Sequence, residues 1–327
     1  MVKKNLKYNL IWTLLAVLVY FVLFGLYNAG IITIFTDAII VNIGINIILA
    51  IGLNLIIGFS GQFSLGHAGF MAIGAYAVAI ITRENPTWLG YFVGILAGII
   101  VAGAIALLVG IPTLRLKGDY LAIATLGISE IIRILIVNVD SVTNGPAGIF
   151  GIPFFSNWQI VYLFVVFSLI VVTNFIHSAS GRAVLSIRED EIAAEAMGIN
   201  TTKYKVVAFV LGAVLASVGG SLFAGYQQSV FPNDYGFMKS IDILIIVVFG
   251  GMGSTTGAVI SAVVLGVLNM YLQDFGSLRM IIYALAIIII MIFKPSGLLG
   301  TKEISIKAIF AKFGKKEEEI NASTDGK

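Results

Sequence analysis

Long apolar segments separated by short polar ones dominate this chain, and most have the length of a membrane-crossing helix. The predicted spans are residues 10–26, 39–57, 64–81, 89–111, 120–137, 160–176, 205–226, 241–249, 257–272 and 280–293. The eighth segment is unusually short, so the pattern predicts about ten spans, with a range of eight to ten. Glycine-rich interruptions indicate that some spans are broken or re-entrant. The pattern therefore predicts an all-α polytopic membrane protein.

The composition agrees with this class and excludes several kinds of chemistry. Apolar residues make up 59% of the chain and charged residues 11%, and the mean hydropathy is +1.02. The net charge of +3 is small and lies mostly near the ends and in loops, which indicates lipid headgroup contact and not nucleic-acid binding. There is no cysteine, and His67 and His177 are far apart, so we expect no disulfide, metal centre or intramembrane enzyme site.

The distribution of basic residues predicts the orientation. Three lysines precede the first span, which is longer than a signal-peptide core and is interpreted as an uncleaved span that starts in the cytoplasm. The loop with Arg115 and Lys117, the loop of residues 178–204 and the end after Lys294 then fall inside, whereas residues 28–37 and 138–158 fall outside and contain no lysine or arginine. Both termini are therefore expected in the cytoplasm of a multi-pass cell-membrane protein.

Two segments outside the spans complete the predicted domain organisation. Residues 1–300 form the membrane domain, and residues 301–327 form a charged cytoplasmic tail that we expect to be disordered and to contact lipid headgroups. The outer segment, residues 138–158, is rich in turn formers and is interpreted either as a structured loop where a second protein docks or as a plain connector.

The largest polar block within the chain is residues 178–204. Residues 188–197 are rich in helix formers, and Gly198 follows where a helix would end. We therefore predict a short helix over residues 188–197 outside the bilayer, closed by Gly198 and a turn at Asn200. It is either a surface read by another protein or an ordinary solvated loop helix.

A glycine-rich polar stretch, residues 58–76, interrupts the second and third spans. Backbone at membrane depth can leave the helix only where protein or a water-filled cavity satisfies its polar groups. The stretch is therefore a candidate for a broken helix that lines a solute path, with Gly61, Ser64, Gly66 and His67 as candidate path residues. The alternative is close helix packing through small residues.

A similar stretch, residues 249–258, contains Gly251 and Ser254, the remaining candidate path residues. Paired interruptions are typical of internally repeated transporters. Their positions in the order of spans do not fit a simple five-span repeat, so the repeat stays a hypothesis.

Few charges lie within the predicted spans. Glu130 and Arg133 are three residues apart on one helix face, where they can neutralise each other, and Asp242 lies near a helix end. An ion-coupled carrier generally uses more buried ionisable groups. The chain also lacks the G-x-x-x-x-G-K-[ST] phosphate loop, so energy for active transport would come from another subunit.

Five motifs, in order, resemble those of one transporter family. They are residues 64–70 (Ser-Leu-Gly-His-Ala-Gly-Phe), 117–127 (beginning Lys-Gly-Asp-Tyr), 193–200 (Ala-Ala-Glu-Ala-Met-Gly-Ile-Asn), 249–254 (Phe-Gly-Gly-Met-Gly-Ser) and 294–300 (Lys-Pro-Ser-Gly-Leu-Leu-Gly). The chain is similar over residues 39–300 to the M-type permease subunit of the branched-chain amino acid ABC transporter.

The resemblance implies an importer subunit for leucine, isoleucine and valine that does no covalent chemistry. It implies a homologous second permease, two ATPase subunits that bind the ATP, and an extracytoplasmic binding protein. The polar loop would then be the ATPase-coupling loop, with Arg188, Ala193, Ala194, Glu195 and Gly198 as its candidate residues. Ile192 stands where the general importer motif has glutamate. The alternatives are a permease for urea or short amides, or an ion-coupled secondary carrier.

Overall fold

The computed structural model describes residues 2–272, 275, 278–294, 296–300 and 303. The chain divides into two compact units, one formed by Met1–Ile34 with Lys302–Lys327 and the other by Phe35–Thr301. The predicted tail of residues 301–327 lies outside the described residues except for Glu303. Each unit is described below by itself.

Helix α1 (Val2–Asn28) belongs to the first unit and contains the predicted first span. Its apolar part, Ile11–Asn28, is 18 residues long with a mean hydropathy of 2.0, which is enough to cross a membrane. The helix ends because Gly30 has a φ of +70°, a left-handed conformation that glycine adopts without strain.

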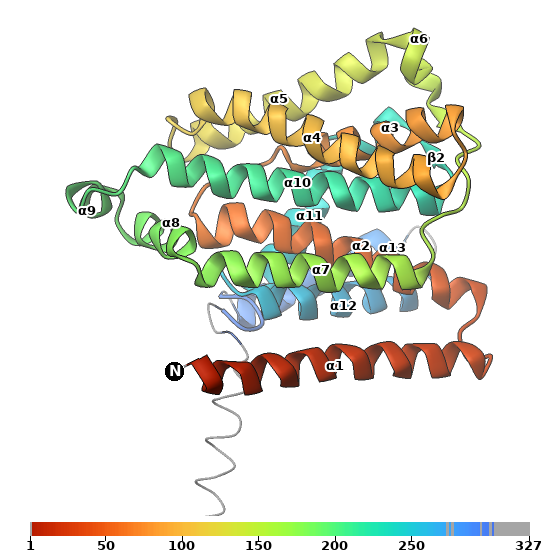
Figure 1. The fold of residues 1–327 in the computed structure, drawn as a ribbon, viewed down its shortest axis with the longest axis horizontal. Coiled ribbons are helices and arrows are strands. Elements are labelled where there is room, and N and C mark those ends of the chain that lie inside the picture. Colours follow the sequence, from red (N-terminus) through yellow and green to blue (C-terminus); the bar gives the residue numbers. More distant parts are fainter. Residues whose placement is uncertain (1, 273–274, 276–277, 295, 301–302, 304–327) are drawn as a thin grey trace, which may run out of the picture. The chain divides into compact units, whose positions relative to one another are not determined.

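The second unit is a helical bundle (Figure 1). Its elements are α2 (Ile34–Asn54), η1 (Leu55–Phe59), α3 (His67–Glu84), α4 (Trp88–Thr113), α5 (Asp119–Asn138), α6 (Asp140–Thr143), η2 (Gly145–Ala147), β1 (Ile149–Phe150), α7 (Trp158–His177), α8 (Ala179–Glu189), α9 (Glu191–Ala196), α10 (Thr201–Gln227), β2 (Ser229–Val230), η3 (Pro232–Tyr235), α11 (Phe237–Gly250), α12 (Thr255–Tyr271) and α13 (Leu278–Phe293).

Each predicted span coincides with a described helix, and the all-α class is confirmed. Six of the described helices are long and apolar enough to cross a membrane. A seventh crossing is added if α11 and α12, which are bent by 117° at their junction, are counted as one broken span. The number of about ten spans stays a prediction.

The core of the second unit forms where α10 packs against α3 and α4. Small residues make this approach possible: a Cβ atom built at Gly74 of α3 would overlap the Ser217 carbonyl of α10, and one built at Gly98 of α4 would lie 3.0 Å from the Gly74 Cα. A Cβ at Gly220 would overlap the Met71 carbonyl. In a membrane, such close backbone contact supplies the packing that the hydrophobic effect supplies in water.

Each end of the bundle has its own set of loops, and contacts between these loops hold each set together. At one end, Glu191 forms ion pairs with Lys117 and Lys205, which joins the α4–α5 loop to the α8–α10 region. At the other end, β1 pairs with β2, which joins the α6–α7 segment to the α10–α11 segment. The first set contains the loops that the basic-residue distribution assigns to the inside, and the second contains residues 138–158, which it assigns to the outside.

The outer segment, residues 138–158, is a structured loop, as one of the two interpretations predicted. Ile149 of β1 pairs with Val230 of β2. Asn144 adopts a φ of +60° and donates a hydrogen bond from Nδ2 to the Gly148 carbonyl (2.8 Å), while Thr143 Oγ1 donates to the Ile136 carbonyl (2.6 Å). Backbone and side-chain hydrogen bonds therefore fix the loop.

The close contact at Gly74 gives a first testable prediction. We expect Gly74→Ala to lower the stability of the purified protein by roughly 1–3 kcal/mol, because the added methyl group meets backbone and not a flexible side chain. Thermal unfolding in detergent measures this. The control is Gly103→Ala in α4, where the nearest atom, Val214 Cγ2, would lie 3.6 Å away. Equal melting temperatures for the two variants would contradict the packing account.

Candidate functional site

The candidate site is formed by two helix interruptions and one charged loop at the same end of the second unit. The first interruption is residues 55–66, which consist of η1 and the segment that leads to α3. The second interruption is residues 251–254, between α11 and α12. The polar loop is residues 178–204 and contains α8 and α9.

The first interruption begins with a π-helical turn, η1, at the end of α2. The Ser60 hydroxyl donates to the Ile56 carbonyl (2.7 Å), and the backbone N–H of Gln62 donates to the same carbonyl (3.0 Å). Gly61 has a φ of +69°, which turns the chain out of the helix. Single π turns of this type are common at functional sites.

Side chains from other helices satisfy the non-helical backbone that follows. The Leu65 amide donates to Thr125 Oγ1 of α5 (3.0 Å), and the Ala68 amide donates to Ser240 Oγ of α11 (3.1 Å). Gln62 Nε2 donates to the Lys205 carbonyl at the start of α10 (3.2 Å). The interruption is therefore tied to three helices, as backbone away from water requires.

The second interruption contains two glycines in conformations that L side chains rarely adopt, with φ of 109° at Gly251 and 89° at Gly253. Ser254 then begins α12, because its hydroxyl accepts a hydrogen bond from the Gly257 amide (3.0 Å). The Leu298 amide donates to the Phe249 carbonyl at the end of α11 (2.8 Å). The Ser-Gly-Leu-Leu-Gly stretch therefore packs on the second interruption and satisfies part of it.

Asn54 joins the two interruptions. Its Nδ2 donates to the Ser254 carbonyl (2.8 Å), and its Oδ1 accepts from the Gly253 amide (2.9 Å). Asn54 is only 1% exposed. Asn54 is not among the residues predicted from the sequence, although an amide at the end of an otherwise apolar span is a signal that identifies such a residue.

Arg188 binds the first interruption and lies against the second. Its Nη1 donates to the Gly58 carbonyl (2.9 Å), and its Nε and Nη2 bind the neighbouring Glu189. A Cβ atom built at Gly253 would lie 2.8 Å from Nη1, and one built at Gly61 would lie 3.1 Å from Cγ. A cation at the carbonyl end of α2 and η1 is electrostatically favourable, and only glycine leaves space for it.

The helix predicted over residues 188–197 is wrong in its bounds. The chain forms two helices, α8 and α9, because Asp190 is extended and caps α9 by accepting hydrogen bonds from the amides of Ile192 (2.9 Å) and Ala193 (3.0 Å). The predicted end at Gly198 is confirmed. Gly198 has a φ of +82°, and the Ile199 amide donates to the Ala194 carbonyl (3.0 Å), as in a Schellman motif.

Glu191 holds α9 to the rest of the unit and was not among the predicted residues. Its carboxylate contacts Lys205 Nζ (2.6 Å) and Lys117 Nζ (3.2 Å). Burial alone would raise the pKa of Glu191, but the hydrogen bonds and attraction of the two lysines outweigh it and lower that pKa below its ordinary value. A second contact, from Thr201 Oγ1 to Glu195 Oε1 (2.7 Å), closes the loop.

The predicted coupling residues differ in exposure. Ala194 is 4% exposed and packs within the chain, so it seats α9, whereas Ala193 and Glu195 face outward. Two apolar side chains of α9 and its C-terminal cap are far more exposed: Ile192 at 78% and Met197 at 83%. Their apolar character within a charged loop was a signal that sequence analysis did not use.

The predicted path residues are brought to one region but do not surround a described cavity. Ser64 and His67 are buried at the start of α3, and a Cβ atom at Gly66 would overlap the Thr125 carbonyl. Gly251 packs on the backbone of Gly300. For the glycines, the geometry is that of close packing.

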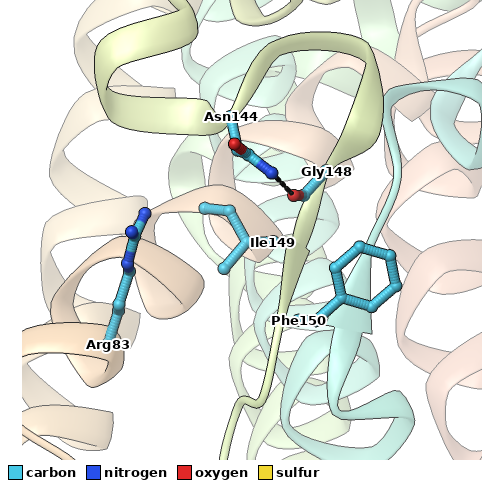
Figure 2. A pocket seen from close by; sticks show the side chains of 5 residues that line it. All are labelled: Arg83, Asn144, Gly148, Ile149 and Phe150. Carbon is cyan, nitrogen blue, oxygen red and sulfur yellow. Dashed lines mark hydrogen bonds between the residues drawn. The ribbon is translucent and has the colours of Figure 1, made fainter.

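A described cavity of about 230 Å³ lies at the opposite end, beside the outer loop. It is lined by Arg83, Asn144, Gly148, Ile149 and Phe150. Figure 2 shows Arg83 on the end of α3, facing the loop that the Asn144–Gly148 hydrogen bond closes.

An all-α bundle of membrane-length helices, with interrupted helices joined to a charged loop, is the architecture of a multi-pass membrane transport protein. Residues 35–293 match the family described as "Branched-chain amino acid transport system / permease component". The chain belongs to this family, and the resemblance seen in the sequence is confirmed.

Individual relatives agree with the family. The chain is 37% identical over 273 residues to the high-affinity branched-chain amino acid transport system permease protein LivM of Salmonella typhimurium, covering 73% of this chain and 64% of the relative. The LivM protein of Escherichia coli is 36% identical over 272 residues, with the same coverage. The LivH permease protein of Salmonella typhimurium is 32% identical over 151 residues, covering 45% of this chain and 47% of the relative. The chain thus spans about 64% of the length of the two LivM relatives.

The Asn54 contact gives a second prediction. We expect Asn54→Ala to speed hydrogen exchange of the amides in residues 251–254, because the buried Gly253 amide loses its acceptor, at a cost of about 1–3 kcal/mol. Mass spectrometry of the purified protein measures this. Asn138→Ala, which removes an exposed hydrogen bond to the Ile134 carbonyl, is the matched control and leaves these amides unchanged. Unaltered exchange of the amides in residues 251–254 in Asn54→Ala would contradict the role of Asn54 in joining the two interruptions.

Glu191 gives a third prediction, on pH. A carboxylate with a lowered pKa stabilises the folded arrangement above its ordinary value of 4.5 and loses this effect as the pH falls through the lowered value. Spin labels at Ala193→Cys and Arg115→Cys are therefore expected to give a narrow distance distribution at neutral pH that broadens on acidification below 4.5. Glu191→Gln broadens it already at neutral pH, whereas the control Glu189→Gln does not. A narrow distribution in Glu191→Gln would refute the anchoring role.

Proposed function

We propose that the chain is a membrane subunit of an ATP-driven importer for the branched-chain amino acids leucine, isoleucine and valine. The observation that carries the proposal is the contact of Arg188 with the Gly58 carbonyl and beside Gly253. Through Arg188, the polar loop contacts both segments where the membrane-length helices are interrupted. A movement of the loop therefore reaches the interruptions directly.

The polar loop is the proposed receiver of energy from ATPase subunits. The ion pairs of Glu191 and the buried side chain of Ala194 fix α9 to the rest of the unit, so α9 moves with it as a rigid element. Its exposed apolar side chains, Ile192 and Met197, suit insertion into a groove of a partner protein. Gly198 gives the sharp exit to α10.

The two ends of the unit fit different partners. The end with the polar loop is assigned to the cytoplasm and to two ATPase subunits. The end with β1, β2 and the Arg83 cavity is assigned to the outside, where an extracytoplasmic binding protein delivers the solute. A homologous second permease completes the path, and the 32% identity to a LivH protein supports a pair of related permeases in such systems.

The alternatives predict different behaviour. A permease for urea or short amides has the same architecture but transports neutral solutes. An ion-coupled carrier transports without ATPase subunits and uses an ion gradient. The names of the relatives, which specify branched-chain amino acids, favour the importer.

The proposal is tested through Met197. We expect Met197→Asp to reduce co-purification of the ATPase subunits with the permease and to reduce ATP-dependent leucine uptake by at least about tenfold, because a charge enters an apolar contact. Met238→Asp is the control, since Met238 is also highly exposed (73%) but lies at the other end of the unit. Normal assembly and uptake with Met197→Asp would count against the assigned interface, and uptake by the purified chain alone under an ion gradient would favour the carrier.

A further inference from the structure

Helix α5, which has the length of a membrane span, carries a charged pair in its second half. Glu130 Oε2 lies 2.8 Å from both Nε and Nη2 of Arg133. The two side chains remain 32% and 27% exposed, so neither is buried within this chain. At 1.5 Å per residue, Glu130 lies roughly 12 Å and Arg133 roughly 8 Å from the nearer end of α5, at Asn138.

This depth is unusual for the molecule. Within the helices that the structure describes as long and apolar enough to span a membrane, Glu130 lies farther from either helix end than any other charged side chain, and Arg133 lies one turn closer to the end of α5. Charged groups at such depth cost at least about 2.5 kcal/mol each in lipid and therefore face protein or water-filled space. The face of α5 that carries the pair is thus a surface of the transport path or of a partner that encloses it.

Aliphatic side chains flank the pair on the same helix stripe. Ile123, Gly127, Glu130 and Ile134 follow one another at intervals of three or four residues, which places them on one side of α5. Ile123 is 65% exposed and Ile134 50% exposed. A Cβ built at Gly127 would have no atom within 4 Å. The stripe therefore combines the Glu130 carboxylate with an open aliphatic surface, and Arg133, one turn after Glu130, borders it.

We propose that this stripe is a binding site for a zwitterionic aliphatic amino acid. Arg133 binds the α-carboxylate and Glu130 binds the α-ammonium group, while the aliphatic side chain lies over Gly127 and points toward Ile123. An amino acid carries both charges on one carbon, so a cation and an anion one helical turn apart match it, and the planar guanidinium suits a carboxylate. The inference rests on the proposed function and assigns its solute contact.

The opposite face of α5 connects the stripe to the candidate site. Thr125 accepts the hydrogen bond of the first interruption, and Ser129 lies so close to Gly69 that a Cβ there would be 2.9 Å from its Oγ. Lys117, just before α5, forms the ion pair with Glu191 of the polar loop. Movement of the loop is thereby transmitted to the helix that holds the solute.

The absence of cysteine in the chain allows a direct test with single reporters. The complete importer, with a cysteine-free second permease, the ATPase subunits and the binding protein, is reconstituted in liposomes. Gly127→Cys is labelled with a charged methanethiosulfonate during turnover, with or without leucine. The control reporter is Leu163→Cys on α7, where the side chain is 62% exposed. Leucine is expected to slow labelling at position 127 at least about tenfold and not at position 163.

Charge variants separate solute binding from a merely structural pair. Glu130→Gln and Arg133→Gln are each expected to abolish protection of Gly127→Cys and to lower leucine uptake at least about tenfold. The double variant E130R/R133E keeps an ion pair but reverses its order. We expect it to fold in the same yield as the unmodified protein and to lack leucine uptake, as the single variants do.

Three results would overturn the inference, and they differ in what else they overturn. Normal leucine uptake without protection at position 127, or full uptake by E130R/R133E, removes the α5 site and leaves the importer function intact. A wild-type complex that transports urea or acetamide but not leucine removes both.

Discussion

The structure depends on one constraint: a buried backbone polar group must have a partner inside the protein. The two interruptions break the helical hydrogen-bond pattern, and side chains of other helices pair with several of the freed groups. Asn54 satisfies both sides of the second interruption, and Thr125 and Ser240 satisfy the first. Because these partners come from α2, α5 and α11, the interruptions cannot shift without moving several helices together.

The same constraint explains why the polar loop has mechanical influence. Arg188 is the partner of the Gly58 carbonyl, so a residue of the loop completes the hydrogen bonding of the interrupted helix. Displacing α8 leaves that carbonyl to find water or another donor, which changes the relative free energies of the arrangements available to the interruption. Glu191 adds a second connection, through Lys205 to α10 and through Lys117 to α5.

Much of the fold could be predicted from the sequence because its signals are local. Apolar length located the helices, and a glycine after a short helical pattern located the end of α9 at Gly198. The break at Asp190 was missed because its capping role depends on an extended conformation that composition does not reveal. Asn54 and Glu191 were missed because their partners lie elsewhere in the chain. Asn54 binds Ser254, 200 residues away, and Glu191 binds Lys205, 14 residues away. Such contacts exist only after the helices pack.

The position of α5 unites these features. Its buried face supplies Thr125 to the first interruption, its inner end follows the lysine that binds Glu191, and its open face carries Glu130 and Arg133. A rigid helix transmits displacement along its length without changing its own hydrogen bonds, whereas an interrupted helix changes them locally. Under the proposed function, loop movement changes the position of a solute held on α5, and it changes the conformation of the interruptions. Transport needs both, because the solute must be displaced and the path on one side of it must close.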